Sequence, residues 1–342
     1  MKKHTLIASS LALSGALFLN ASAFADGQKQ PADTAPPETA TAVDFINAFE
    51  KLSGAHPGFR KAHAKGVCVQ ATFSPNTDSP FAGSPLFSNG DLPASIRFSV
   101  GGGNPVSDER TPGVRGMGTQ IKLPGGGMHT FTGNSTPVFA AKDPETFLGL
   151  LQRLMPDESG RPNMARLGAY IAANPSTQAG AMWSRTTPAP ASYANTPYFG
   201  LHTFFYQADD AQEQVKFRWH IEPSLGNKGL DAEASATLPA LFLEDTLKEQ
   251  VANEETPVTF TIIATLGEEN DTNIDPSVQW PKERPQVNMG TLTLNSVGTQ
   301  SCDKTNYDPN LLSSGFTPSD DPVLRMRSPA YGISFGKRLS GQ

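Results

Sequence analysis

One histidine lies between two cations in the stretch FRKAHAKGVCVQATF, residues 59–73. His63 stands between Arg60 and Lys65, just before an alternating apolar pattern that predicts a strand. A neutral imidazole can accept a proton and pass it on, so His63 is a candidate acid–base group at the end of that strand. The stretch alone does not distinguish a catalytic histidine from a structural one.

The other chemistry-bearing residues follow no pattern of a metal hydrolase, a serine hydrolase or a phosphate-binding loop. His56, His129, His202 and His220, the other histidines after residue 25, show no H-E-x-x-H spacing. The sequence has no G-x-S-x-G motif. Its glycine-rich stretches SVGGGNP and LPGGGMH are not followed by helical patterns, as a phosphate loop would be. The residues alone therefore indicate a β-rich globular protein with a basic, polar strand face.

The first 25 residues have the pattern of a secretory signal peptide. Two lysines form a basic start, residues 6–19 are apolar, and the tripeptide Ala-Phe-Ala at 23–25 offers a cleavage site. Because the signal is of bacterial type, we expect export to the periplasm. Residues 26–40 are rich in Pro, Ala and Thr and predict a flexible lead-in, and residues 41–342 are expected to form a single domain.

Charge and cysteine content limit the partners. Cleavage would remove two of the 27 cations and none of the 33 acidic residues, which leaves 25 against 33 and a net charge of −8. A surface this acidic argues against nucleic acid or an anionic membrane as a partner. The two cysteines, Cys68 and Cys302, could pair in an exported protein, but the sequence leaves open whether they meet.

Hydrophobic periodicity predicts eight strands interrupted by helices. Apolar residues alternate over 67–73 and 94–100, as in strands with one buried face. Further strands are expected at 116–123, 127–132, 199–207, 214–222, 257–266 and 289–296. Helical patterns cover 41–53, 144–155, 162–173 and 236–252. Because the elements do not alternate as βαβ units, we expect an α+β fold, an antiparallel eight-stranded β-barrel with helical insertions.

Five segments resemble, in the right order, the motifs of the haem catalases. They are RKAHAKG, IRFSV (96–100), RTPGVRGMGTQIKL (110–123), GNSTPVFAAKDPETF (133–147) and DDPVLRMRSPAYGISFGKR (320–338). The resemblance covers about residues 43–338 and extends the expected fold to a barrel of catalase type. The chain is shorter than a typical catalase and resembles the small, exported, catalase-related peroxidases.

The resemblance implies haem b as the cofactor, with Tyr331 as the axial ligand of its iron. Arg327, four residues earlier, matches the cation that would favour the phenolate form of the ligand. Pro329 lies between the two and is expected to interrupt a helix. One resolution is that Ser328 caps a fresh helix with Pro329 in its first turn, in which case Arg327 reaches Tyr331 across a bend.

The same resemblance assigns roles around the haem. His63 matches the residue that shuttles the peroxide proton, Asn134 the donor that orients the peroxide, and Ser99 the residue that sets the imidazole tautomer. The haem propionates would bind arginines, and apolar rings would flank the haem. The matching residues are Arg60, Arg97 and Arg338 for the propionates and Phe139 and Phe147 for the pocket wall.

Two departures from the catalase pattern stand out. The stretch KFRW places Arg218 where the family carries a histidine beside the proximal arginine, and Asp321 matches the acid that two neighbouring arginines would need. The chain also lacks matches to the long N-terminal arm, the wrapping segment and the C-terminal helical domain of large catalases. We therefore expect no NADPH site and no large catalase tetramer.

Several functions are compatible with these motifs. The first is a haem peroxidase that reduces hydrogen peroxide, and organic peroxides in addition, with an external small-molecule electron donor. Such an enzyme would keep some catalase activity and serve defence against oxidative stress. The alternatives are a true compact catalase and an enzyme that rearranges fatty-acid hydroperoxides. A non-enzymatic haem carrier is disfavoured because it needs neither the His63 base nor the Asn134 donor.

Overall fold

The computed structural model describes residues 33–342, except residues 89, 209–212 and 300. The expected signal peptide lies outside the described residues, as does the first part of the lead-in, residues 26–32. In the remainder of the lead-in, Arg153 donates to the carbonyl oxygens of Asp33 and Ala35, and Asn174 donates to that of Thr34. No helix among the described residues has the length and apolar character needed to cross a membrane.

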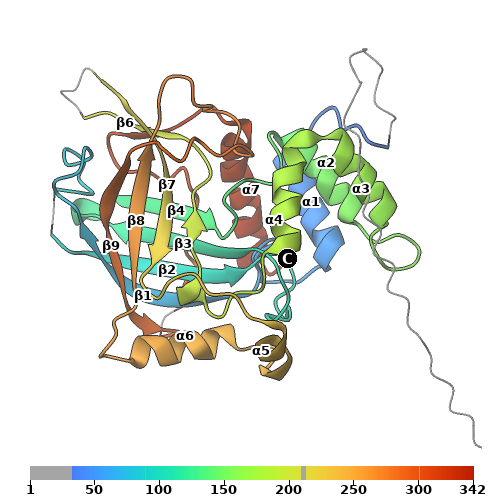
Figure 1. The fold of residues 1–342 in the computed structure, drawn as a ribbon, viewed down its shortest axis with the longest axis horizontal. Coiled ribbons are helices and arrows are strands. Elements are labelled where there is room, and N and C mark those ends of the chain that lie inside the picture. Colours follow the sequence, from blue (N-terminus) through green and yellow to red (C-terminus); the bar gives the residue numbers. More distant parts are fainter. Residues whose placement is uncertain (1–32, 89, 209–212, 300) are drawn as a thin grey trace, which may run out of the picture.

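An antiparallel β-barrel forms the centre of the molecule (Figure 1). Eight strands pair in the closed order β1-β2-β3-β4-β5-β7-β8-β9, and β9 returns to β1. Two short strands, β6 and β10, extend the sheet from β7. The described strands are β1 Gly66–Pro75, β2 Leu92–Val100, β3 Arg115–Lys122, β4 Met128–Asn134, β5 Tyr198–Phe199, β6 Phe204–Tyr206, β7 Val215–Pro223, β8 Thr259–Leu266, β9 Gln286–Val297 and β10 Phe316–Pro318. The eight-stranded α+β fold expected from the sequence is confirmed.

The strand expected at 199–207 is instead two short strands, both paired with β7. Gly200 lies against the indole of Trp219, where a Cβ atom would come within 2.4 Å of Cε2. Leu201 adopts a left-handed φ of 66°, which breaks the strand and lets His202 turn into the protein. The interruption thus delivers a histidine to the interior that a regular strand would not.

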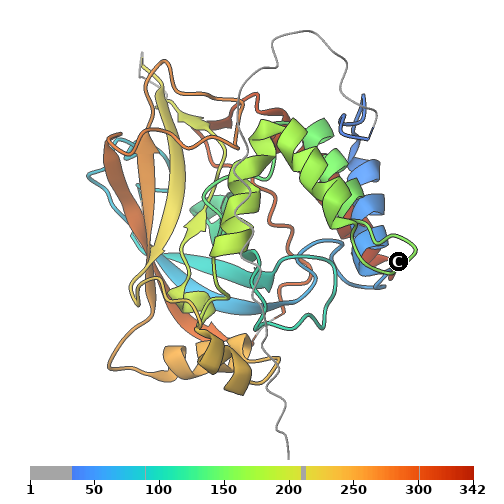
Figure 2. The same cartoon turned by 45° about the vertical axis from the view of Figure 1, so that its right-hand side comes forward.

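Helices lie beside and below the barrel. In Figure 1, α1–α4 and α7 stand to one side of it and α5 and α6 lie beneath it, and Figure 2 shows the same arrangement turned by 45°. The helix expected at 236–252 is divided, because Pro239 follows the end of α5 and Glu109 accepts hydrogen bonds from the first N–H groups of α6. The described helices are α1 Ala42–Ser53, α2 Pro144–Leu154, α3 Met164–Ala173, α4 Gln178–Thr186, α5 Ala232–Thr237, α6 Leu243–Ala252 and α7 Pro322–Leu339.

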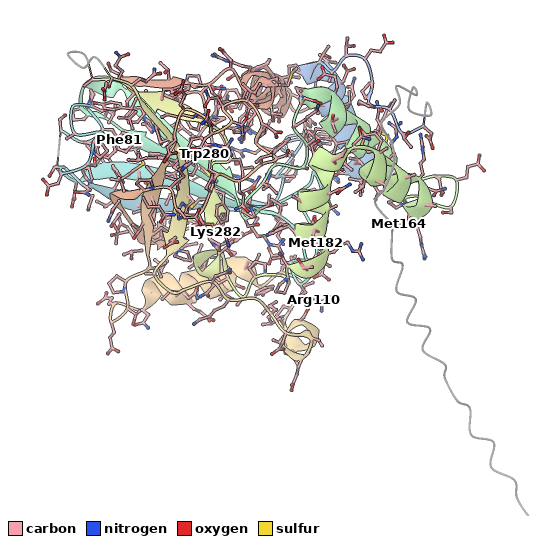
Figure 3. All side chains as sticks on the ribbon, turned by 45° about the horizontal axis from the view of Figure 1, so that its top comes forward. Phe81, Arg110, Met164, Met182, Trp280 and Lys282 are labelled. Atoms are coloured by element: carbon pink, nitrogen blue, oxygen red, sulfur yellow. A yellow bond between two sulfur atoms is a disulfide. The ribbon has the colours of Figure 1, made fainter. Side chains whose placement is uncertain are left out.

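The two faces of β1–β4 differ in polarity, and this difference decides where a site can form. One face carries the buried apolar side chains of the main core, among them Val69, Ile96 and Phe98. Figure 3 labels Phe81, which is fully buried and packs its ring on other aromatic rings of that core. The alternate residues of the same strands, such as Arg97 and Ser99, face away from the core. The polar side chains of β1–β4 that could contribute to a site therefore lie on that second face.

Candidate active site

A row of four cross-strand neighbours forms the floor of the site. The register pairs Gly66 with Ser99, Ser99 with Gly116, and Gly116 with Asn134. Directly opposed residues in an antiparallel sheet place their side chains on one face, with Cβ atoms roughly 4.5–5.5 Å apart. The structure therefore brings Ser99 and Asn134 to the same face, with a side-chain-free strip at Gly116 between them.

His63 occupies that strip. Its Nδ1 is hydrogen-bonded to Ser99 Oγ at 3.0 Å. A Cβ atom at Gly116 would lie 2.7 Å from Nδ1 of His63 and 2.6 Å from Ser99 Oγ, so only glycine leaves room for this pair. The predicted contact between His63 and Ser99 is thus present in the structure, and Gly116 is a site residue that the sequence analysis missed.

The backbone of His63 is held in an unusual conformation. Its φ is 54°, in the left-handed region that non-glycine residues seldom adopt. Arg97 donates from Nη1 to the carbonyl oxygen of His63 at 2.9 Å and from Nη2 to that of Ala64 at 3.0 Å. This forked pair of bonds holds the loop in the strained conformation that directs the imidazole over Gly116.

His63 is neutral at physiological pH. Burial lowers the pKa of its imidazole to about 4, with further lowering by the charges of Arg97, Arg327 and Arg60. The residue as a whole is only half-buried. A neutral imidazole that remains reachable is the form that can accept a proton from a small molecule.

Asn134 has its amide orientation set by a local turn. Its Oδ1 accepts a hydrogen bond from the N–H of Thr136 at 3.1 Å. With the oxygen used in this way, the NH₂ end of the amide is the group that can donate to a ligand. Asn134 closes β4 directly beside Gly116, so a donor stands next to the His63 imidazole.

Tyr331 and Arg327 meet on α7. Arg327 donates from Nη2 to the phenol oxygen of Tyr331 at 2.9 Å. The helix runs unbroken from Pro322 to Leu339 and includes Pro329, so the expectation of a fresh helix capped by Ser328 is wrong. Ser328 Oγ instead donates to Asp308 at 3.0 Å. The i, i+4 geometry therefore holds across the proline, and the guanidinium charge lies beside the phenol oxygen.

Arg218 is held by the 272–280 loop. Its guanidinium donates to the carbonyl oxygens of Thr272, Asp275 and Val278 and lies 4.7 Å over the ring of Trp280. Its Nε–H donates to Thr203 Oγ1 at 3.1 Å, and the charge of Asp321, which caps α7, acts on it. Burial lowers the pKa of Arg218 to about 10, which leaves it charged.

His202 takes the place next to Asp321. Its Nδ1 is 2.7 Å from Asp321 Oδ2, and the other carboxylate oxygen caps the start of α7. His202 is fully buried, and its Nε2 has no hydrogen-bond partner among the described residues. Burial lowers the pKa of His202, and the charge of Arg327 contributes to the lowering. His202 is a second residue that the sequence analysis missed, since its placement depends on the break at Leu201.

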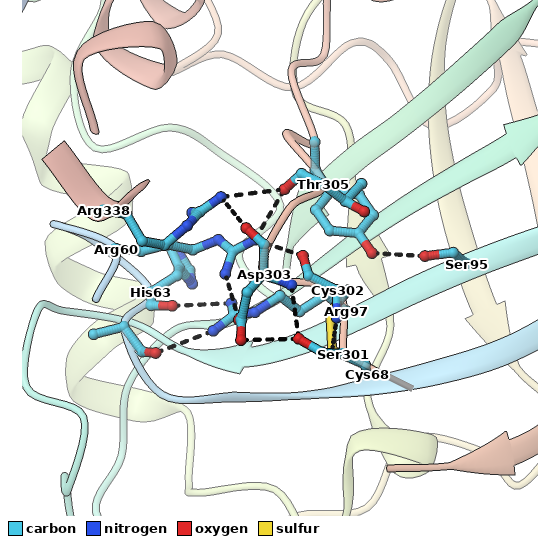
Figure 4. Close-up of a disulfide and its surroundings, with 12 residues drawn as sticks. Arg60, His63, Cys68, Ser95, Arg97, Ser301, Cys302, Asp303, Thr305 and Arg338 are labelled. Atoms are coloured by element: carbon cyan, nitrogen blue, oxygen red, sulfur yellow. Dashed lines mark hydrogen bonds and ion pairs between the residues drawn. A yellow bond between two sulfur atoms is a disulfide. The ribbon is translucent and has the colours of Figure 1, made fainter. Parts of the chain in front are cut away.

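Three arginines gather at the side of the site. Arg60, Arg97 and Arg338 all line a cavity of about 450 Å³, and Figure 4 shows them converging around the segment 301–305. Burial, and then the charge of Arg60, lowers the pKa of Arg97 to about 9 and that of Arg338 to about 10. Among the described residues, Arg338 Nε has no hydrogen-bond partner although it is buried. Such a cluster is short of anionic partners.

The two predicted pocket phenylalanines pack against each other. The rings of Phe139 and Phe147 lie 4.8 Å apart in an edge-on arrangement. Phe147 also stacks on Phe45 of α1 at 5.6 Å, and Phe139 approaches His202 at 6.3 Å. The structure thus connects the apolar wall to α1 on one side and to the His202–Asp321 pair on the other.

These residues fit a haem group. A tyrosine oxygen held by a guanidinium is a suitable single axial ligand, and no group of three or more His, Cys, Asp or Glu side chains among the described residues could hold a metal ion. The arginine cluster, with its unpaired buried Nε, fits a ligand that brings two carboxylates. The assignment of each residue to haem or peroxide stays a prediction.

Comparison with known proteins agrees with this geometry. Residues 26–342 match the family model described as catalase. The chain belongs to the catalase family. It is 37% identical to a catalase-related peroxidase of Synechococcus elongatus, over 88% of this chain and 89% of that protein. It is 32% identical to a catalase-related peroxidase of Mycolicibacterium paratuberculosis, over 84% and 92%.

Solved catalases share the fold of this catalase-family chain. A fungal catalase superposes with a TM-score of 0.75 at 22% identity, and catalase A from Saccharomyces cerevisiae does so with 0.75 at 21%. The chain spans only 60% and 64% of those two proteins. The shared part is 83% and 87% of this chain, so nearly all of it has the catalase fold.

Proposed function

We propose that this member of the catalase family is a haem b peroxidase that reduces hydrogen peroxide, and organic peroxides in addition, with electrons from an external small-molecule donor. The observation that carries the proposal is the neutral His63 imidazole, bonded to Ser99 and seated on Gly116, in one site with an arginine-held Tyr331. The high coverage of two catalase-related peroxidases supports the same class. The enzyme would serve defence against peroxide and keep some catalase activity.

The residues divide the chemistry between two sides. When bound, haem supplies the iron at which the peroxide is reduced, and Tyr331 is the residue that would hold that iron. On the other side, His63 accepts a proton from one peroxide oxygen and returns it to the other, so that the second oxygen can leave as water. In the tautomer that carries its proton on Nδ1 and donates to Ser99 Oγ, the free lone pair of the imidazole is on Nε2.

The remaining residues orient and stabilise. Asn134 donates from its amide NH₂ to the peroxide and fixes it beside the imidazole. Arg327 donates to the Tyr331 oxygen and places its charge beside it. Arg60, Arg97 and Arg338 would bind the two propionates, and Phe139 and Phe147 would keep water from the haem face.

Reaction type is decided by what reduces the oxidised enzyme, a donor or a second peroxide. The chain spans close to nine tenths of the catalase-related peroxidases but about 60% of the large catalases. The similarity to the catalase-related peroxidases favours the reaction with a donor. Oxidation of a phenolic dye and evolution of oxygen from peroxide alone are compared on one preparation. Dye oxidation faster than oxygen evolution is expected.

Two other outcomes of that comparison are informative. Rapid oxygen evolution with negligible dye oxidation would identify a compact catalase instead. Consumption of a fatty-acid hydroperoxide without a donor, with an isomer as product, would identify a rearranging enzyme. Either outcome would overturn the peroxidase assignment.

The location and remaining partners follow the sequence pattern. Export to the periplasm by residues 1–25 is tested by fractionating cells that express the full chain and sequencing the N-terminus of the exported form. Cleavage after residue 25 is expected. We further propose that the enzyme works without NADPH, nucleic acid, membrane or a large catalase-type tetramer. Titration with NADPH and sedimentation analysis test the first and last of these.

A further inference from the structure

The connection between β9 and β10 runs along the arginine cluster. Residues 298–315, residue 300 aside, form no helix or strand. The Cys68–Cys302 disulfide, which the sequence left open, joins this connection to β1 across 234 residues of sequence. Cys302 N–H also lies 2.9 Å from Cys68 Sγ, and Gly298 N–H donates to the carbonyl oxygen of Cys68 at 2.8 Å. The start of the connection is therefore fixed to the edge of the site.

Directly after the disulfide, three carbonyl oxygens accept hydrogen bonds from two of the arginines (Figure 4). Arg60 Nη2 donates to Cys302 O at 3.2 Å and to Thr305 O at 3.0 Å. Arg338 Nη2 donates to Asp303 O at 2.5 Å and to Thr305 O at 3.5 Å. Thr305 N–H closes the turn on Cys302 O at 3.0 Å. The turn 302–305 is thus a carbonyl cradle for Arg60 and Arg338.

The carbonyl cradle offsets the repulsion between the two arginine side chains. Arg60 and Arg338 lie close enough that the charge of Arg60 contributes to lowering the pKa of Arg338. The carboxylate of Asp303 compensates weakly, because it is 3.7 Å from Arg60 and its side chain is 73% exposed. The partially negative carbonyl oxygens of the turn, of which Thr305 O accepts from both guanidinium groups, are the buried counterpart. Without a fixed turn, the two cations would separate.

We propose that the Cys68–Cys302 disulfide is a positioning link for the haem-binding arginines. It holds the 302–305 turn in place, and the turn holds Arg60 and Arg338 at the separation that two propionate groups need. The haem site is therefore complete in the disulfide-bonded chain. The chain with both thiols reduced binds haem weakly, although its barrel is folded. This inference rests on the proposed function, since it takes haem as the ligand.

The barrel does not depend on this link alone. Beyond the turn, Tyr307 anchors the same connection a second time. Its hydroxyl is 2.8 Å from Ser95 Oγ, and its carbonyl oxygen accepts from Thr132 Oγ1 at 2.8 Å. The ring packs on Gly118, where a Cβ atom would lie 2.8 Å from Cγ of Tyr307. Loss of the disulfide should therefore loosen residues 298–305 and leave the barrel intact.

The test compares haem-free full-length protein with the double variant Cys68→Ser/Cys302→Ser. Titration with haem should show a dissociation constant about 10- to 100-fold higher for the variant, as expected for weakening one or two charge-assisted contacts. Amide hydrogen exchange of the haem-free proteins should be faster at residues 302–305 in the variant and unchanged in β2, β3 and β4. An unchanged dissociation constant would overturn the proposal, whatever the exchange at residues 302–305.

A second pair of proteins tests the route of the effect. In an Arg60→Gln/Arg338→Gln background, removing the disulfide should change the haem dissociation constant by less than about 3-fold, because the positioned groups are already gone. A full 10- to 100-fold loss in that background would show that the link acts elsewhere and overturn the assignment.

The controls separate this proposal from its premise. If the intact protein fails to bind haem, the proposed function fails, whereas haem binding that is indifferent to the disulfide rejects only the positioning link. If the serine variant does not fold, wild-type protein with its disulfide reduced and alkylated without denaturant replaces it. Global unfolding in both would overturn the proposal, because the proposal requires the barrel to persist.

Discussion

Arg327 donates a hydrogen bond from Nη2 to the phenol oxygen of Tyr331 over 2.9 Å, across one turn of α7 that continues through Pro329. The guanidinium carbon also lies 5.5 Å from the centre of the phenol ring. The bond places the positive charge of Arg327 beside the phenol oxygen that we propose as the iron ligand. Substitution of each residue in turn distinguishes the role of Tyr331 from that of Arg327.

Replacement of the ligand or of its cation should affect haem differently. Tyr331→Phe should abolish the phenolate–iron absorption band, because the only ligand oxygen on α7 that faces the haem in this proposal is lost. Arg327→Gln should keep the band but weaken haem binding, because the phenol oxygen loses its charged hydrogen-bond donor. Haem titration and the absorption spectra of the loaded proteins measure both effects. Wild-type affinity in the Arg327→Gln protein would contradict the charge argument.

Gly116→Ala should disable the distal side without removing haem. The new Cβ atom would meet His63 Nδ1 at 2.7 Å and Ser99 Oγ at 2.6 Å, so their hydrogen bond must break or shift. We expect the rate of reaction with peroxide to fall by about 10²–10⁴, the usual contribution of a positioned acid–base group. Stopped-flow absorption of the haem-loaded protein measures the rate. Gly168→Ala in α3, where no atom lies within 4 Å of the new Cβ, is the matched control and should react like wild type.

The sequence allowed much of this site to be predicted, because its contacts are local or carried by motifs. Eight strand segments followed from period-two patterns, and Arg327 and Tyr331 lie four residues apart in one motif. Gly116 was missed because its role comes from cross-strand register, which composition does not specify. The partners of Arg218 could not be predicted because its carbonyl acceptors lie 54 to 60 residues further along the chain.

Arg218→Met should therefore lower stability rather than alter the haem. The substitution removes hydrogen bonds to three loop carbonyls and the contact with Trp280. Loss of charge-assisted bonds and a cation–π contact should reduce the free energy of unfolding by about 2–4 kcal/mol. Urea unfolding measures this change, and the absorption spectrum of the haem complex should stay that of wild type. A shifted spectrum at unchanged stability would instead show that the charge of Arg218 acts on Tyr331.

The acid limb of the pH–rate profile should report the titration of His63. Burial and the neighbouring arginines lower the pKa of this imidazole to about 4, so it is neutral, and able to act as a base, at every pH well above 4. The rate of reaction with peroxide should be flat from about pH 5 to 8 and fall roughly tenfold per unit below pH 4, because the protonated form cannot accept the peroxide proton. An ordinary histidine would place that fall near pH 6.5.

The free energy of unfolding also decreases as the pH falls, so this effect must be separated from the effect on the rate. Between pH 6.5 and 4 the unfolded chain binds more protons at this residue than the native protein does, so the free energy of unfolding decreases as the pH falls through that window. Short pH jumps from neutral buffer, with the haem band recorded without peroxide, show that the protein is still folded when the rate is read. A wild-type profile that falls near pH 6.5 would remove His63 from the role of base.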